Sequence, residues 1–170
     1  MDIDEMVYIG DEVVNQDGLL NNSNVTASFV DAGAAGATEW AEKTPDEILA
    51  DVNTLIKDSW AASGNTYCPT KLLLPPTQFA WIVSQKVSTA GNVSILTFLE
   101  DNSISLRVNG KKLDIQPCKW LSGRGVAAGS PEAATDRMCC YTQDADIVRY
   151  PLVPLQKTPL EYRSLYQLTT

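Results

Sequence analysis

The segment TPDEILADVNTLIKDSWAA, residues 44–62, decides how this chain folds. It opens with an N-cap threonine, a proline at the first helical position and Glu47 three residues after the cap, which together form a capping box. Apolar residues then recur at helical spacing along one face, at Ile48, Leu49, Val52, Leu55, Ile56 and Trp60. The polar residues expected to face away from this stripe are Asp51, Asn53, Lys57 and Asp58. The pattern predicts an amphipathic helix from about 45 to 62, ended by Gly64, that covers a core.

A buried strand and two further helices are predicted after this helix. Lys71-Leu72-Leu73-Leu74 is a short apolar run closed by Pro75-Pro76, as expected of a strand that leads into a helix start. The next helix is expected to stop at Gly91, and a shorter one is expected over Ser94 to Asp101. The apolar face of the longer of these two helices consists of Phe79, Ile82, Val83 and Val87.

The chain before the capped helix is predicted to be a small β piece followed by a linker. Met6-Val7-Tyr8-Ile9 and Val13-Val14 are typical of short strands, and the Asp17-Gly18 step is a turn signal. Residues 31–38 are mostly glycine and alanine, with almost nothing to pack, and predict a surface linker. This linker separates the small N-terminal piece from the main body.

The second half of the chain is predicted to be rich in strands. Residues 105–108 and 111–115 flank Asn109-Gly110, which favours a type I′ hairpin because both residues tolerate positive φ. Further strands are expected at 137–141 and 147–150. Together with the helices, these strands predict a mixed α+β fold.

The composition excludes several functional classes. The chain has 170 residues, with 13 basic and 21 acidic side chains, a formal net charge of -8 and no histidine. Without histidine there is no Ser-His-Asp or Cys-His relay and no HExxH metal site. The acidic balance argues against sequence-independent binding to phosphate backbones. No uninterrupted apolar run approaches the ~18 residues of a membrane span, so we expect a soluble protein.

The cysteines predict free thiols. Cys68, Cys118, Cys139 and Cys140 form no CxxC pair, and no secretion signal accompanies them. The adjacent pair, Cys139 and Cys140, lies in a predicted strand and therefore points to opposite faces. A disulfide framework is the alternative interpretation.

Two segments could carry chemistry, and each has a simpler interpretation. Residues 122–135 include a glycine-rich run that meets neither the Walker A nor the dinucleotide-binding spacing, so we interpret them as a mobile surface loop. Asp144 and Asp146 could ligate a metal ion, but two acidic residues in a turn are more often solvated. We therefore assign no catalytic, cofactor-binding or metal-ligating residue.

Several short motifs, in their order over nearly the whole chain, resemble a known family. They are Ile9-Gly10-Asp11, GLLN at 18–21, the Ala/Gly linker, the capped helix with TPDEIL at 44–49, LLLPPTQF at 72–79, NGKKLDIQP at 109–117, TDRM at 135–138 and TPLEYR at 158–163. This series resembles the major capsid proteins of tailed phages and prophages of the Hong Kong 97 type. The resemblance implies an α+β Hong Kong 97-like capsid fold.

The resemblance also implies a division of the chain. Residues 1–38 would be a peripheral-domain β segment with its linker, residues 39–150 an axial-like α/β domain, and residues 151–170 a strand that returns toward the peripheral domain. The loop near 122–135 would be the axial tip, where the candidate subunit-contact residues are Gly123, Arg124, Gly125 and Gly129. The family's N-terminal arm, extended loop, spine helix and C-terminal end find no match, so we expect a fragment of a longer shell protein.

The resemblance implies a structural role, that of a capsid subunit that self-assembles, performs no catalysis and needs no cofactor. Expected partners are copies of itself and other virion proteins, with packaged DNA contacted only non-specifically and no membrane or small-molecule substrate. We expect the protein in the virion capsid, and in the bacterial cytoplasm during assembly. Two alternatives stay open: a carboxylate-dependent hydrolase or metal-binding enzyme that uses Asp144 and Asp146, and another virion component such as a tail or head-completion protein.

Overall fold

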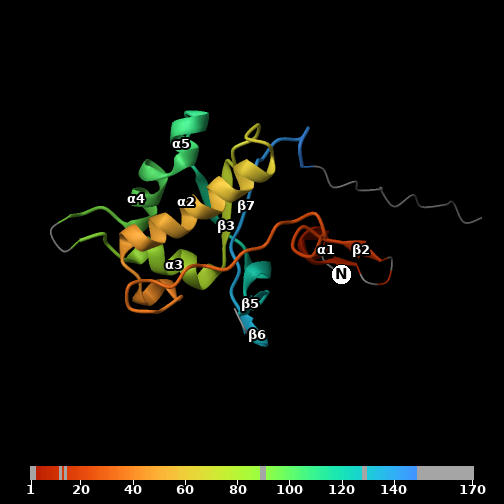
Figure 1. The fold of residues 1–170 in the computed structure, drawn as a ribbon, viewed down its shortest axis with the longest axis horizontal. Helices are drawn as coiled ribbons and strands as arrows, with labels where there is room; N and C mark the ends of the chain where they lie inside the picture. The colour runs from red at the N-terminus through yellow and green to blue at the C-terminus, as the bar shows by residue number, and fades with distance from the viewer. Residues whose placement is uncertain (1–2, 12, 14, 89–90, 128–129, 149–170) are drawn as a thin grey trace, which may run out of the picture.

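Helix α2 (Pro45–Ala62) begins where the sequence predicts it. The computed structural model describes residues 3–11, 13, 15–88, 91–127 and 130–148 (Figure 1). At the start of α2 the Thr44 hydroxyl accepts a hydrogen bond from the Glu47 N–H, and the Glu47 carboxylate accepts one from the Thr44 N–H. The predicted capping box is therefore confirmed. Gly64 follows the helix with a φ of 67°, a conformation that glycine adopts at no steric cost.

The apolar stripe of α2 forms the centre of the main core. Ile48, Val52 and Ile56 are fully buried, and the partly buried members of the stripe are Leu49, Leu55 and Trp60. The prediction for Asp51 was wrong, because this carboxylate is buried instead of facing solvent. Its burial is possible because two donors, Lys43 and Trp40, bind the carboxylate.

A three-stranded sheet has the predicted buried strand at its centre. The strand order is β4-β3-β7, with β3 (Lys71–Leu74) between β4 (Asp114–Pro117) and β7 (Cys139–Tyr141). β4 runs parallel to β3, and β7 runs antiparallel to it. Leu72 faces Ile115 on one neighbour and Cys140 on the other. The strand predicted at 71–74 is confirmed, and the one predicted at 137–141 is confirmed for its last three residues.

Side chains that alternate along β3 enter two separate cores. Leu72 and Leu74 belong to the main core, together with the α2 stripe and with buried residues of the next two helices, Ile82, Ile95 and Leu99. Leu73 belongs to a second, smaller core with Leu20, Cys118 and Leu121. Helices therefore cover one face of the sheet, while the N-terminal module (the described residues up to Leu20) and the short helix η2 (Lys119–Leu121) cover the other.

Helices α3 (Pro76–Ser84) and α4 (Ile95–Asn102) correspond to the two predicted helices. Ser94 caps α4 by accepting from the Thr97 N–H, and this helix is confirmed. α3 is shorter than predicted, because the backbone becomes extended at Gln85 and does not continue to Gly91. The Val87 N–H donates instead to the Val93 carbonyl, and an isolated bridge joins residues 86 and 94.

The hairpin predicted around Asn109-Gly110 was wrong, although residues 114 and 115 of its second predicted strand do lie in a strand, β4. Residues 104–109 form helix α5 (Ile104–Asn109), and Gly110 ends it with a φ of 68° while its N–H donates to the Leu106 carbonyl. A positive φ serves a helix C-terminus as well as a type I′ turn, so the Asn-Gly pair does not distinguish them. Ser105 and Asn109 hold α5 in place by donating to backbone carbonyls of the segment before β3.

The N-terminal module is helical where a strand was predicted at 6–9. It consists of α1 (Ile3–Ile9) and a short antiparallel ribbon of β1 (Gly10–Asp11) and β2 (Gln16–Asp17). The four-residue apolar run from Met6 to Ile9 is too short for its periodicity to separate helix from strand. Residues 31–38 contain no helix or strand, as predicted, and lead into the short helix η1 (Trp40–Glu42).

A hairpin replaces the loop predicted over 122–135. It consists of β5 (Gly125–Ala127) and β6 (Ser130–Thr135), which pair antiparallel and project from the body of the molecule (Figure 1). The predicted strand at 147–150 was wrong for residues 147 and 148, which lie in a turn, while residues 149 and 150 lie outside the described part.

The orientation of α3 can be tested by substituting two neighbouring residues. Ile82 is fully buried, whereas Val83, predicted to share its face, is 46% exposed. We expect Ile82→Ala to lower the free energy of unfolding by about 2–5 kcal/mol because it leaves a cavity. Val83→Ala is the matched control and is expected to change it by less than about 0.5 kcal/mol. Urea denaturation measures both, and equal effects would contradict the observed orientation of α3.

Candidate subunit-contact hairpin and its anchor

The base of the β5–β6 hairpin is held by the carboxylate of Asp136. Its Oδ1 accepts a hydrogen bond from the Gly123 N–H at 2.9 Å, which closes the entry to the hairpin against its exit. Its Oδ2 accepts from Gln78 Nε2 at 2.6 Å, and Gln78 lies in the first turn of α3. The Asp136 carboxylate therefore joins the two ends of the hairpin to each other and joins the hairpin to α3.

Arg137, the next residue, connects the same point to the N-terminal module. Its guanidinium donates to the Leu20 carbonyl at 2.7 Å, and its backbone N–H donates to the Leu121 carbonyl at 3.1 Å. Leu20 in turn belongs to the second core. The hairpin, α3 and the N-terminal module thus meet at two consecutive residues, Asp136 and Arg137.

This anchor joins three of the motifs that were recognised in the sequence. Asp136 and Arg137 come from TDRM, Gln78 from LLLPPTQF and Leu20 from GLLN. Sequence reasoning did not assign these residues a role, because the contacts span 58 and 117 positions along the chain.

Two of the glycines predicted to lie at the contact tip have a structural role at the hairpin base. Gly123 has a φ of 65°, a left-handed conformation that favours glycine. A Cβ atom at Gly125 would lie 2.7 Å from both the Thr135 hydroxyl and the Asp136 carbonyl oxygen, so no larger residue fits there. Arg124, between them, is exposed. Gly129 lies outside the described residues, and the assignment of all four to subunit contacts stays a prediction.

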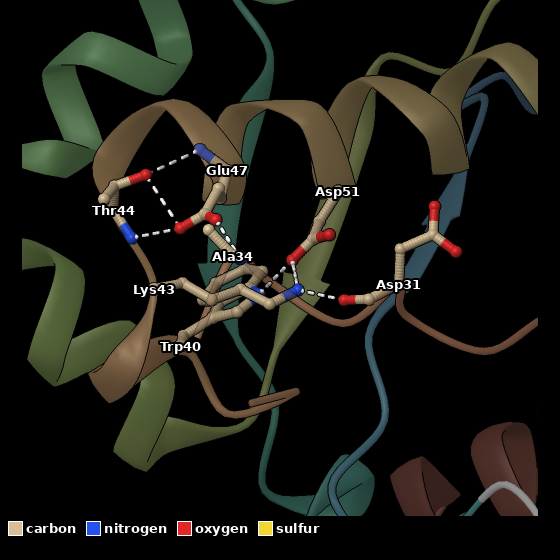
Figure 2. Close-up of polar contacts among 7 residues, drawn as sticks. All are labelled: Asp31, Ala34, Trp40, Lys43, Thr44, Glu47 and Asp51. Atoms are coloured by element: carbon tan, nitrogen blue, oxygen red, sulfur yellow. Dashed lines mark hydrogen bonds and ion pairs between the residues drawn. The ribbon is translucent and has the colours of Figure 1, made fainter. Parts of the chain in front are cut away.

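A second, buried polar cluster joins residues 31–43 to α2 (Figure 2). The Lys43 ammonium contacts Asp51 Oδ2 at 2.7 Å, and these side chains are only 1% and 6% exposed. The Trp40 indole N–H donates to the same oxygen at 3.0 Å, and Lys43 also donates to the Asp31 carbonyl at 2.6 Å. Burial raises the pKa of the Asp51 carboxyl, against the opposing influence of the Lys43 ammonium and the Trp40 N–H.

Glu47, one turn before Asp51, binds three groups at once. Its Oε2 accepts from the Thr44 N–H and from the Thr44 hydroxyl, and its Oε1 accepts a hydrogen bond from the Ala34 N–H at 2.6 Å. Hydrogen bonds from the backbone N–H groups of Ala34 and Thr44 lower the pKa of the Glu47 carboxyl from its usual 4.5 to about 2. The capping glutamate therefore also holds the segment that precedes the helix.

The acidic and thiol side chains that were candidates for chemistry lie in environments that serve the fold. Asp144 accepts a hydrogen bond from the Asp146 N–H at 2.8 Å within a turn, and no cluster of three or more metal-ligating side chains occurs among the described residues. Burial raises the pKa of the Cys139 thiol to about 11 and that of Cys140 to about 12, so both are protonated at neutral pH and weakly nucleophilic. In the described part of the chain no helix is both long and apolar enough to cross a bilayer.

Comparison with known proteins identifies the family. All of residues 1–170 match the sequence model of the major capsid protein family. The chain is a member of that family. No curated protein matches it significantly.

The fold of this capsid-family chain is similar to that of a solved structure described as the capsid of Myoviridae phage XM1. The TM-score is 0.50 at 21% sequence identity, and the similar region covers 69% of this chain and 37% of the phage XM1 chain. The α+β capsid fold expected from the sequence is therefore confirmed, and the match spans well under half the length of that neighbour. The division into peripheral and axial parts stays a prediction.

The anchor of the hairpin can be tested by a double-mutant cycle. Because Gln78 and Asp136 interact directly, the destabilisation caused by Gln78→Ala and Asp136→Ala together is expected to be smaller than the sum of the single effects. We expect a coupling free energy of about 0.5–1.5 kcal/mol from denaturant titrations of the four proteins. A cycle between Gln78 and Asp101, whose carboxylate pairs with Lys112 instead, is the control, with no coupling expected. Zero coupling between Gln78 and Asp136 would contradict the anchor.

The lowered pKa of Glu47 predicts a pH dependence with a definite sign. The ionised carboxylate stabilises the fold above its unfolded-state pKa near 4.5, and this contribution is lost as the pH falls toward 2. We expect Glu47→Gln to have a lower melting temperature than the wild type at pH 7, and the difference to shrink between pH 5 and pH 2. Circular dichroism melts measure it. Glu42→Gln, which removes an exposed acid of η1, is the control, and a gap that does not vary with pH would refute the prediction.

Proposed function

We propose that this protein is a structural subunit of a phage capsid shell, which acts by associating with copies of itself and with other virion proteins. The observation that carries the proposal is the match of the whole chain to the major capsid protein family. The similarity of its fold to a phage capsid supports it. A closed shell requires one rigid subunit to repeat the same contacts many times, and a body with two packed cores suits that task.

The β5–β6 hairpin is the contact element that we propose, in the role of an axial tip. It projects from a body to which Asp136 and Arg137 fix its base, so a contact made at its end would be transmitted to α3 and to the N-terminal module. Exposed Arg124 lies at its entry and is available for a neighbouring subunit. In this proposal residues 39–150 are axial, residues 1–38 are peripheral, and residues 151–170 return to the peripheral part.

The charge distribution supports only loose contact with packaged DNA. The first 42 residues carry nine acidic and no basic side chains, while residues 43–170 carry 12 acidic and 13 basic ones. The negative charge of the first segment repels phosphate backbones. The nearly balanced charge of the second segment cannot hold them tightly. We infer a wall that encloses DNA without binding a particular sequence, assembled in the bacterial cytoplasm and retained in the virion.

The proposed role is structural and involves no catalysis, cofactor or small-molecule substrate. The alternative of a carboxylate-dependent enzyme would rest on Asp144 and Asp146, and the hydrogen bond between them is that of an ordinary turn. The alternative of a tail or head-completion protein has no observation in its favour, whereas the family match favours the shell itself.

Particle formation tests the proposal. The protein, co-expressed with the other head proteins of the same phage, is expected to yield closed particles by electron microscopy, and persistent monomers under those conditions would refute the shell role. Arg124→Glu is expected to reduce particle yield without changing the melting temperature, because it alters only the hairpin entry. Lys57→Glu on the outer face of α2 is the charge-matched control. Equal yields from both variants would exclude the hairpin as the contact element.

A further inference from the structure

The segment between the N-terminal module and η1 has little apolar anchoring. Residues 21–39 contain no helix or strand, and their one large aromatic side chain, Phe29, is 62% exposed. Ordering a backbone costs roughly 1–2 kcal/mol per residue in conformational entropy, which buried apolar surface normally offsets. Here polar contacts have to hold the segment in place.

Helix α2 supplies these contacts from two carboxylates one turn apart (Figure 2). Glu47 accepts the Ala34 N–H at 2.6 Å, and Asp51 fixes the Lys43 ammonium, which donates to the Asp31 carbonyl at 2.6 Å. Gly33 lies close against the same side chains, since a Cβ atom there would be 3.1 Å from Glu47 Oε1. The Glu47 contact is exposed, whereas the Lys43–Asp51 pair is buried beside the main core, where Asp51 also accepts from Trp40.

We propose that residues 31–39, which we name the strap, act as a clasp on α2. A clasp here means a segment that can detach from the helix as a unit while the helix stays folded. Loss of either carboxylate contact opens the strap as a unit while α2 stays folded, because Ile48, Val52 and Ile56 hold the helix independently in the main core. The N-terminal module then remains attached through Arg137 and the second core. The strap thereby sets how far that module can move relative to α2 without either part unfolding.

The strap has a use if the chain is a shell subunit, and this part of the inference rests on the proposed function. Subunits with the same sequence that meet different neighbours in a shell must adopt different conformations. The free-energy cost of that change must be small. A segment held by two polar contacts, with no core residue of its own, can be displaced at lower cost than a helix or a sheet strand.

Amide hydrogen exchange on the full chain tests the clasp. Ala34→Pro removes the N–H that Glu47 accepts but leaves α2 and its capping box unchanged. Proline is compatible with this position, because Ala34 follows Gly33 in a turn closed by the Gly36 N–H and the Gly33 carbonyl at 2.8 Å. We expect strap amides to exchange about ten-fold faster than in the wild type and the amides of residues 48–60 to stay unchanged. Ala34→Ser keeps the N–H and is the matched control, with exchange expected to equal that of the wild type.

Asp51→Asn probes the second contact and is expected to give the same pattern in the strap. Unchanged strap exchange in Ala34→Pro would overturn the proposal. Acceleration of α2 in that variant to the same extent as the strap would also overturn it, because the strap would then not be a separate unit. If Asp51→Asn fails to fold, the Ala34 pair decides the question alone. None of these outcomes depends on particle formation, so failure of the clasp and failure of the shell role are distinguishable.

Discussion

Strand β3 must bury side chains on both of its faces, and the arrangement of the other elements follows from this requirement. Leu72 and Leu74 need one apolar layer and Leu73 needs another, because successive side chains of a strand point in opposite directions. Helices α2, α3 and α4 provide the first layer, and η2 with the N-terminal module provides the second. The neighbouring strands extend the main core, since Ile115 and Cys140 lie opposite Leu72, and Cys139, opposite Leu73, extends the smaller one.

The elements that could be predicted are those with both a periodic apolar face and an explicit cap. α2 has a capping box before its stripe, and α4 has Ser94 before Ile95, so both were located within a residue or two. The errors lie where a local signal has two physical meanings. Gly110 supplies a positive φ that a hairpin turn and a helix end both use, and Met6 to Ile9 is an apolar run without a period.

The anchor and the strap contacts were beyond the reach of sequence patterns for a different reason. Asp136, Arg137 and Lys43 are ordinary charged residues whose partners are set by tertiary structure, over 58 positions in the case of Gln78 and Asp136. Asp51 was misplaced by the same cause, because helical periodicity assigns a charged residue to solvent unless a buried cation is known to meet it. The family could be predicted because order along the chain is visible without any contact.

The adjacent thiols of β7 give each layer of the molecule its own chemical reporter. Cys139 packs in the smaller core beneath the N-terminal module, while Cys140 packs against the α2 side and lies 3.7 Å from the Leu55 carbonyl oxygen. Alkylating reagents react with the thiolate, and burial keeps both thiols protonated, so each sulfur is labelled slowly while its layer stays closed. The order in which these neighbouring sulfurs become labelled therefore records, in the unaltered sequence, which side of the sheet opens first.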